Sequence, residues 1–140
     1  MCKYIKVPFF ISIILFSLFS ISTTAYAEKK IVLGGKNFTE QYILSGIARI
    51  LLERNGFKVE MKNGVGSTVA WQSLENGQID LYYEYTGTAY TIYHKQNDKN
   101  IMTDRDKCYS WVKKADASKG LIWLDPVLFN NTYTLLMRLK

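Results

Sequence analysis

The most distinctive chemistry in this sequence is a cluster of tyrosines between residues 81 and 90. It reads Leu81-Tyr82-Tyr83-Glu84-Tyr85-Thr86-Gly87-Thr88-Ala89-Tyr90. In an extended strand, alternation places Tyr83 and Tyr85 on one face and Tyr82 and Glu84 on the other. The negative faces of tyrosine rings can hold a quaternary ammonium, which has no N–H to donate, at roughly 0.5–2 kcal/mol per ring. The alternative interpretation is the ordinary packing of a tyrosine-rich strand.

Three loops predict where a ligand would bind, because each follows a predicted strand and leads into a predicted helix. They are Gly35-Lys36-Asn37, Gly64-Val65-Gly66-Ser67-Thr68 and Tyr85-Thr86-Gly87-Thr88. In an open parallel sheet, ligands bind at the carboxyl ends of the strands. Helix N-termini at this edge favour an anion, and Lys36 would add a positive charge there. The second loop lacks the Gly-Lys-Ser/Thr ending of a phosphate-binding P-loop.

The sequence offers no catalytic constellation. The single histidine, His94, lies beside Lys95 and Gln96 in a polar stretch and is expected at the surface. No serine occupies a nucleophile-elbow sequence, and the acidic residues are scattered singly, with Glu84 the one near the predicted ligand edge. Residues 28–140 contain one cysteine, Cys108, which excludes a disulfide or a cysteine-based metal site within them. We therefore predict a protein that is not an enzyme and that uses no cofactor and no metal.

Strands and helices alternate along the chain. Strands are predicted at residues 29–33, 57–61, 79–85, 121–124 and 132–137. Helices are predicted after Asn37, after residues 64–68, from Gly87, and from Thr103 or Asp104 to Gly120. The first helix carries apolar residues at 3.6-residue spacing: Ile43, Leu44, Ile47, Ala48 and Leu51. This alternation predicts βαβ units and an α/β fold with a mainly parallel sheet.

Residues 1–27 have the features of a secretory signal peptide. Lys3 and Lys6 precede an apolar stretch at 7–21, which ends in the small-x-small pattern Ala25-Tyr26-Ala27. The apolar stretch is shorter than the roughly 20 residues that span a bilayer as a helix. The sequence therefore predicts an exported, periplasmic (or otherwise extracytoplasmic) protein, with an uncleaved membrane anchor as the alternative.

Composition and charge exclude further classes of protein. The 140 residues are 48% hydrophobic, which excludes a disordered chain, and their number fits one ordinary domain at most. The formal net charge of +6 comes with no run of Lys or Arg longer than a pair. Nucleic-acid binding needs basic residues clustered on one face, so nucleic acid is not a predicted partner.

The chain after Ala27 resembles the substrate-binding proteins of ABC transporters that import osmoprotectants such as glycine betaine, choline, carnitine and related quaternary amines. The resemblance is carried by four stretches: Gly34-Gly35-Lys36-Asn37-Phe38-Thr39-Glu40-Gln41, Gly64 to Thr68, Ile79 to Thr88, and Asn130-Asn131-Thr132-Tyr133. The stretch Glu84 to Thr88 is fairly specific to this family, whereas the Gly-x-Gly turn is not.

The resemblance implies a periplasmic-binding-protein-like fold of type II, in which two α/β lobes clamp the ligand. It implies that Tyr85 and Tyr133 supply two walls of an aromatic box, that Thr88 lends a hydroxyl, and that Lys36 stands over the polar end of the ligand. Lys36, Tyr85 and Thr88 also lie in the loops that the residues alone predict to form the ligand-binding edge of the sheet. Tyr133 rests on the resemblance alone.

Two lobes need roughly 200–300 residues at typical domain sizes of about 100–150. We therefore expect residues 28–128 to form the first lobe and residues 129–140 to start the crossover to a second lobe, with the chain truncated before that lobe is complete. The expected partners are a quaternary amine, the membrane permease of an ABC transporter and a separately encoded second lobe. The alternatives are a binding protein for another small zwitterion, such as an amino acid, and a half-domain without ligand-binding activity.

Overall fold

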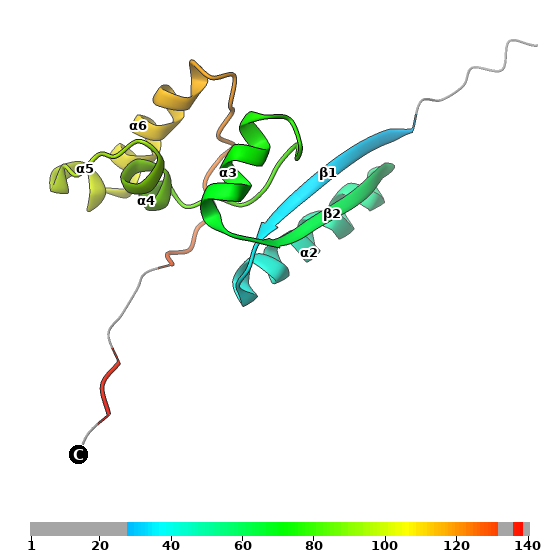
Figure 1. Ribbon diagram of the computed structural model, residues 1–140, viewed down its shortest axis with the longest axis horizontal. Helices are drawn as coiled ribbons and strands as arrows, with labels where there is room; N and C mark the ends of the chain where they lie inside the picture. The colour runs from blue at the N-terminus through cyan, green and yellow to red at the C-terminus, as the bar shows by residue number, and fades with distance from the viewer. Residues whose placement is uncertain (1–27, 132–135, 139–140) are drawn as a thin grey trace, which may run out of the picture.

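The computed structural model describes residues 28–131 and 136–138, which form an α/β structure (Figure 1). Its elements are, in chain order, β1 (Lys29–Lys36), α2 (Thr39–Arg54), β2 (Phe57–Val65), α3 (Ser67–Glu75), α4 (Thr86–Thr88), the π-helical turn η1 (Ala89–Tyr93), α5 (Lys99–Met102) and α6 (Arg105–Ala117). Figure 1 shows α2 along one face of the two strands and α4, α5 and α6 grouped beyond the strand ends. The predicted α/β class is confirmed.

The two strands β1 and β2 are parallel neighbours, as expected for a βαβ unit. Their register runs from Lys29 opposite Phe57 to Gly34 opposite Lys62, with an irregularity between Gly34 and Lys36. The apolar run at the centre of β1 includes Leu33, which is fully buried. The parallel arrangement brings the carboxyl ends of both strands to one edge.

The strand predicted at residues 79–85 is reduced to a single parallel bridge between Leu33 and Leu81. The Gly34 N–H donates to the Leu81 carbonyl at 2.9 Å, and the Asp80 N–H donates to the Val32 carbonyl at 2.8 Å. The segment therefore lies beside β1 where it was expected. It leaves the ladder early because the side chains that follow Leu81 are held by the polar contacts described below.

The strand predicted at residues 121–124 is wrong, because this segment has no regular secondary structure. Side chains of the 121–124 segment and of α6 tie it to that helix: the Trp123 Nε1–H donates to Asp116 Oδ2 at 2.7 Å, and the Tyr109 hydroxyl donates to the Leu124 carbonyl at 3.1 Å. Ile122 is 83% exposed. For the strand predicted at 132–137, residues 132–135 lie outside the described residues, and residues 136 and 137 are not in a strand.

Helix α2 forms where its periodicity predicted it, but it begins at Thr39 with Phe38 as N-cap rather than at Asn37. The residues that it buries are Gln41, Ser45 and Ala48. Of the predicted apolar stripe, Ile43, Ile47 and Leu51 are about half exposed. Gln41 points inward to polar partners near Tyr85. The face of α2 that packs against the sheet is therefore rotated away from the apolar stripe that the periodicity predicts.

A hydrophobic core lies between η1 and α6. Its buried residues are Ala89, Tyr90, Cys108 and Val112. Cys108 is confirmed as a core residue, and its burial raises the pKa of its thiol. Helix α6 is capped by Asp104, one of the two residues predicted as its cap, and the Asp104 carboxylate accepts the N–H groups of Asp106 and Lys107.

The prediction that His94 lies at the surface is wrong. Its side chain is 13% exposed, and its Nε2 lies 2.7 Å from Oδ1 of the fully buried Asp116. The imidazole also meets Trp71 and Trp111 edge-on, at centroid distances of 6.0 and 5.1 Å. The polar neighbours in the sequence gave no sign of this, because the partners come from α3 and α6.

Gly34 lets the segment after Ile79 approach β1 closely. A Cβ at this position would lie 2.5 Å from Ile79 Cδ1 and 3.3 Å from Tyr82 Cβ. We expect Gly34→Ala to lower the free energy of unfolding by about 1–3 kcal/mol, as overpacking does. In the matched control Gly46→Ala, within α2, the added Cβ meets nothing within 4 Å, so stability should rise by about 0.5–1 kcal/mol. Urea unfolding of both variants measures this, and equal stability of the two would contradict the close approach.

Candidate functional site

Tyr85 lies at the edge where β1 ends and the 79–85 segment passes it. Its hydroxyl accepts a hydrogen bond from Gln41 Nε2 at 3.1 Å and donates one to Glu40 Oε1 at 2.7 Å. Gln41 is 1% exposed, and its amide also donates to the Tyr83 carbonyl at 3.1 Å. The first turn of α2 therefore fixes the orientation of the Tyr85 ring.

An aromatic neighbour extends this edge. The Phe38 ring lies 6.0 Å from the Tyr85 ring, centroid to centroid, with an interplanar angle of 31°. Phe38 is 37% exposed and Tyr85 is partly buried, so both rings are within reach of solvent. Two neighbouring rings that differ in tilt form adjacent walls to which a cationic or apolar ligand can bind.

Beneath Tyr85 lies a buried ion pair between Lys36 and Glu84. The Lys36 ammonium pairs with Glu84 Oε1, and the two side chains are 1% and 6% exposed. The other carboxylate oxygen of Glu84 accepts from the hydroxyls of Tyr82 at 2.6 Å and Tyr93 at 2.9 Å. The Tyr85 N–H donates to Glu84 Oε1 at 2.7 Å. Glu84 thus joins the end of β1 to the segment that carries Tyr85.

The same ion pair places a positive charge against aromatic rings. The Lys36 Nζ lies 5.0 Å from the centroid of the Tyr85 ring and 5.8 Å from that of Tyr82. These distances lie within the range of a cation–π contact. Lys36 therefore makes a cation–π contact with the Tyr85 ring from the interior.

Burial keeps the tyrosine hydroxyls of this edge protonated. Desolvation, followed by the Glu84 carboxylate, raises the pKa of Tyr82 and of Tyr93. Desolvation also raises the pKa of Tyr85, and the hydrogen bond to Glu40 acts in the same direction. All three hydroxyls remain hydrogen-bond donors, which maintains the contacts that hold Tyr85.

The structure brings together Lys36 and Tyr85, two of the four predicted site residues. Thr88 follows within α4, whose N-cap is Tyr85, and is partly buried. Tyr133 lies outside the described residues. Asn131, two positions before it in the sequence, donates through Nδ2 to Glu40 Oε2 at 3.0 Å. Asn131 therefore lies at the Tyr85 edge.

Sequence reasoning missed four residues that hold or border Tyr85: Phe38, Glu40, Gln41 and Asn131. Three of them belong to the run that follows β1, which contributed to the resemblance but was assigned no role. Tyr90 was also predicted to belong to the aromatic cluster at residues 81–90. In the structure, Tyr90 is 1% exposed and packs in the core beside Trp111. The packing interpretation is correct for Tyr90.

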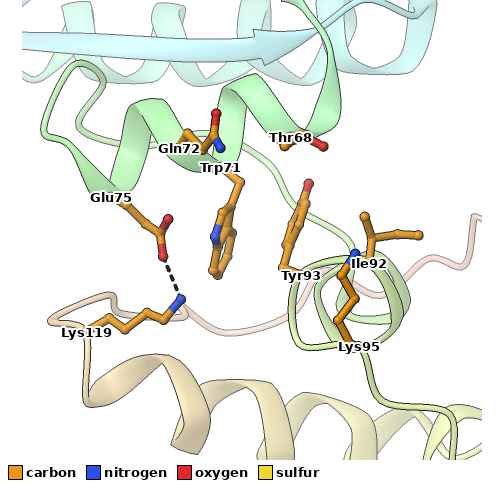
Figure 2. Close-up of a pocket in the computed structure, with 8 residues that line it drawn as sticks. All are labelled: Thr68, Trp71, Gln72, Glu75, Ile92, Tyr93, Lys95 and Lys119. Carbon is orange, nitrogen blue, oxygen red and sulfur yellow. Dashed lines mark hydrogen bonds and ion pairs between the residues drawn. The ribbon is translucent and has the colours of Figure 1, made fainter.

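A hollow lies between α3 and η1, with a cavity volume of about 310 Å³. It is lined by Thr68, Trp71, Gln72, Glu75, Ile92, Tyr93, Lys95 and Lys119 (Figure 2). Figure 2 shows Trp71 between Tyr93, which stacks on it at 4.4 Å, and Lys119, whose Nζ lies 5.4 Å from the indole ring. Lys119 is in turn paired with Glu75 at 2.6 Å. None of the predicted site residues that the structure describes lines this hollow.

Within residues 28–131 and 136–138, no group of three or more His, Cys, Asp or Glu side chains is arranged to hold a metal ion. In the same described part of the chain, no helix has the length and apolar character needed to cross a membrane.

Comparisons with known proteins agree on one family. Residues 29–140 match the family model described as the substrate binding domain of ABC-type glycine betaine transport system. A glycine-betaine-binding protein of Pseudomonas aeruginosa is 43% identical over 105 residues, which cover 75% of this chain and 33% of that protein. An ergothioneine transport permease/ergothioneine binding protein, EgtU of Helicobacter pylori, is 33% identical over 135 residues, which cover 94% of this chain and 24% of that protein.

The structural comparison agrees. The solved apo structure of YehZ from Escherichia coli superposes with a TM-score of 0.68 at 30% identity, covering 76% of this chain and 37% of that one. The chain spans between about a quarter and two fifths of the length of the relatives that it matches. The predicted type II periplasmic-binding-protein-like lobe is confirmed by this likeness.

Proposed function

This chain belongs to the family of substrate-binding domains of ABC-type glycine betaine transport systems, and we propose that it captures a quaternary amine osmoprotectant at the Tyr85 edge for delivery to an ABC permease. The members of this family bind solutes, and we propose no enzymatic activity for this one. The observation that carries the proposal is the partly buried Tyr85 ring, which is held in place by contacts from α2 and lies beside the Phe38 ring.

The names of the relatives point to a common ligand group. Glycine betaine and ergothioneine, which appear in the names of the relatives from P. aeruginosa and H. pylori, both carry a trimethylammonium group. Such a group cannot donate hydrogen bonds, so aromatic faces are its natural partners. A trimethylammonium ligand such as glycine betaine, choline or carnitine therefore fits an edge formed by aromatic rings, and a binding protein for an amino acid stays the alternative.

In this proposal Tyr85 and Tyr133 are the aromatic walls and Thr88 lends a hydroxyl. Lys36 supports Tyr85 from beneath through its pairing with Glu84, and its contact with the polar end of a ligand stays a prediction. We further propose that residues 1–27 direct export to the periplasm or its equivalent, and that a second lobe completes the ligand cleft.

Substitution of Tyr85 tests the function. We expect Tyr85→Ala to weaken binding of glycine betaine or choline by about 2- to 30-fold, because the loss of one ring face costs roughly 0.5–2 kcal/mol. Tyr85→Phe keeps the ring and should weaken binding less, although it removes the hydroxyl that meets Gln41 and Glu40. Dissociation constants from NMR titration, which reaches the millimolar range, provide the measurement.

The control for this test is Tyr90→Phe, which changes a buried tyrosine in the same segment outside the proposed site. Its ligand affinity should equal that of the wild type. If Tyr85→Ala and Tyr85→Phe weaken binding equally, the hydroxyl rather than the ring face is what matters, and the aromatic interpretation of this position is wrong.

A further inference from the structure

Asp116, in the last turn of α6, is an acidic side chain without access to water. It is fully buried, and both of its oxygens have a partner. Its Oδ1 lies 2.7 Å from His94 Nε2, and its Oδ2 accepts from the Trp123 Nε1–H at 2.7 Å. The position itself opposes a negative charge, because the C-terminal end of a helix carries the negative end of the helix dipole. An acidic group placed here needs a positive partner or a proton of its own.

His94 is the partner that can carry a positive charge, because the Trp123 indole is neutral and can only donate its N–H. The imidazole is 13% exposed and meets Trp71 and Trp111 edge-on. Two arrangements satisfy the pair: an imidazolium beside a carboxylate, or a neutral imidazole beside a carboxylic acid. Both hold one proton more than a neutral imidazole beside a carboxylate, which would leave a net negative charge buried at the end of α6.

The Trp123 contact fastens a segment that has no regular secondary structure. Residues 121–131, here called the strap, follow α6 and end with Asn131 at the Tyr85 edge. Two further side chains of α6 donate to carbonyl groups of the strap, at 3.1 and 3.0 Å: Tyr109 to Leu124 and Arg105 to Val127. Since the strap is not part of the sheet, its attachment depends on contacts of this kind. Of these three side-chain contacts, the one between Trp123 and Asp116 involves a buried ionisable group.

The other ionisable groups on the elements packed around the pair have partners of their own or are exposed. Glu75 of α3 pairs with Lys119, which follows α6, at 2.6 Å. Tyr93 of η1 donates to Glu84 Oε2, and burial raises the pKa of its hydroxyl. Burial likewise raises the pKa of the Cys108 thiol. Of the remaining groups, Tyr90 packs edge-on against Trp111, and the charged ones are exposed: Lys95, Lys113, Lys114 and Asp125.

From this arrangement we propose that His94 and Asp116 form a pH-sensitive latch, which fastens Trp123 and the strap while the pair holds its proton and releases them when the proton is lost. Loss of the proton at alkaline pH leaves a net negative charge in the interior. That charge is relieved when Trp123 separates from Asp116 and water enters. Because the strap ends at the Tyr85 edge, its release also loosens the contact of Asn131 with Glu40.

The direction of the pH effect follows from the number of protons that each state binds. In the unfolded chain, aspartate has lost its proton above about pH 4 and histidine above about pH 6.5, whereas the folded pair keeps one. Stability therefore falls as the pH rises, by at most about tenfold in the folding equilibrium constant per pH unit. Between about pH 6.5 and about pH 8.5 we expect a fall of about 5- to 20-fold for the wild type, measured by urea unfolding of the full chain.

Asp116→Asn removes the charge and keeps the shape of the side chain. The asparagine Oδ1 can still accept from the Trp123 indole, and its amide can donate to a neutral imidazole, so no proton is held and the fall should disappear. The matched control is Asp106→Asn, the same change at an exposed aspartate of α6, which should retain the fall of the wild type. A parallel loss of stability with pH in the wild type and in Asp116→Asn would overturn the latch.

A second measurement follows the strap itself. The Trp123 Nε1–H gives a signal in 1H–15N NMR spectra, which is identified by its absence in Trp123→Phe. In the folded wild type this signal should move toward the position of an exposed indole between about pH 6.5 and about pH 8.5, whereas in Asp116→Asn it should stay in place. A purely structural contact gives no such shift. A signal that keeps its position in the wild type overturns the proposal, and this result decides the matter even where Asp116→Asn does not fold.

Discussion

Lys36→Met is expected to destabilise the protein by about 3–5 kcal/mol. The substitution leaves the Glu84 carboxylate buried without its partner, at 6% exposure, and the loss of one member of a buried ion pair costs about that much. Since domains are typically stable by about 5–15 kcal/mol, this loss is a large fraction of the total stability. Urea unfolding followed by circular dichroism measures the effect.

A matched control exists on the same strand. Lys30 also pairs with a glutamate, Glu60, at 2.6 Å, but the two side chains are 56% and 43% exposed. Lys30→Met should therefore destabilise the protein far less than Lys36→Met, because an exposed ion pair contributes little to stability. Equal destabilisation by Lys36→Met and Lys30→Met would show that burial of the Lys36 pair is not what matters.

The double variant Lys36→Met/Glu84→Gln separates charge from packing. A glutamine at position 84 can still accept from the hydroxyls of Tyr82 and Tyr93, so the double variant should be more stable than Lys36→Met alone. It would also lose the ammonium beneath Tyr85. If the double variant is less stable than Lys36→Met, Glu84 contributes through hydrogen bonds that glutamine cannot reproduce.

The sequence predicted the local elements well, because their signals are local. The apolar run of β1, the periodicity of α2 and the Asp104 cap of α6 are each visible within a few residues, and all three elements form. The strand at 121–124 failed because its contacts with Asp116 and Tyr109 come from side chains on α6. Alternation cannot reveal whether an apolar run finds a strand partner.

In the candidate site, too, local features were predicted and long-range contacts were not. Tyr85 and Lys36 were predicted to share an edge because both follow strands of a parallel sheet, and they lie in contact. The sequence could not show that Glu84, 48 residues beyond Lys36, would take up the lysine charge. Nor did it assign Glu40 to the ring, since the contact with Tyr85 spans 45 residues. The position of a residue along a strand predicts where its side chain lies. Whether the charge of that side chain is neutralised depends on partners from other elements.

A second prediction concerns how much one lobe can do. Among the described residues, Tyr85 is the one predicted ring wall that the structure places at the edge, and the resemblance adds Tyr133. We expect the 140-residue chain alone to bind glycine betaine or choline weakly, in the millimolar range. If two further rings from a second lobe are each worth around 1 kcal/mol, their absence lowers affinity by roughly 30-fold, since 1.4 kcal/mol is tenfold.

Closure should add to this difference. A ligand held by one lobe keeps water on its outer side, whereas a second lobe removes that water and strengthens every electrostatic contact inside the cleft. The comparison is between the chain alone and a chimera in which residues 28–131 replace the matching part of YehZ from E. coli, with calorimetry or NMR titration as the measurement. The chimera should bind at least 30-fold more tightly, and Tyr85→Ala within it should remove part of that gain. Micromolar or tighter binding by the monomeric 140-residue chain would refute the prediction, because the Tyr85 edge would then suffice without a closing lobe.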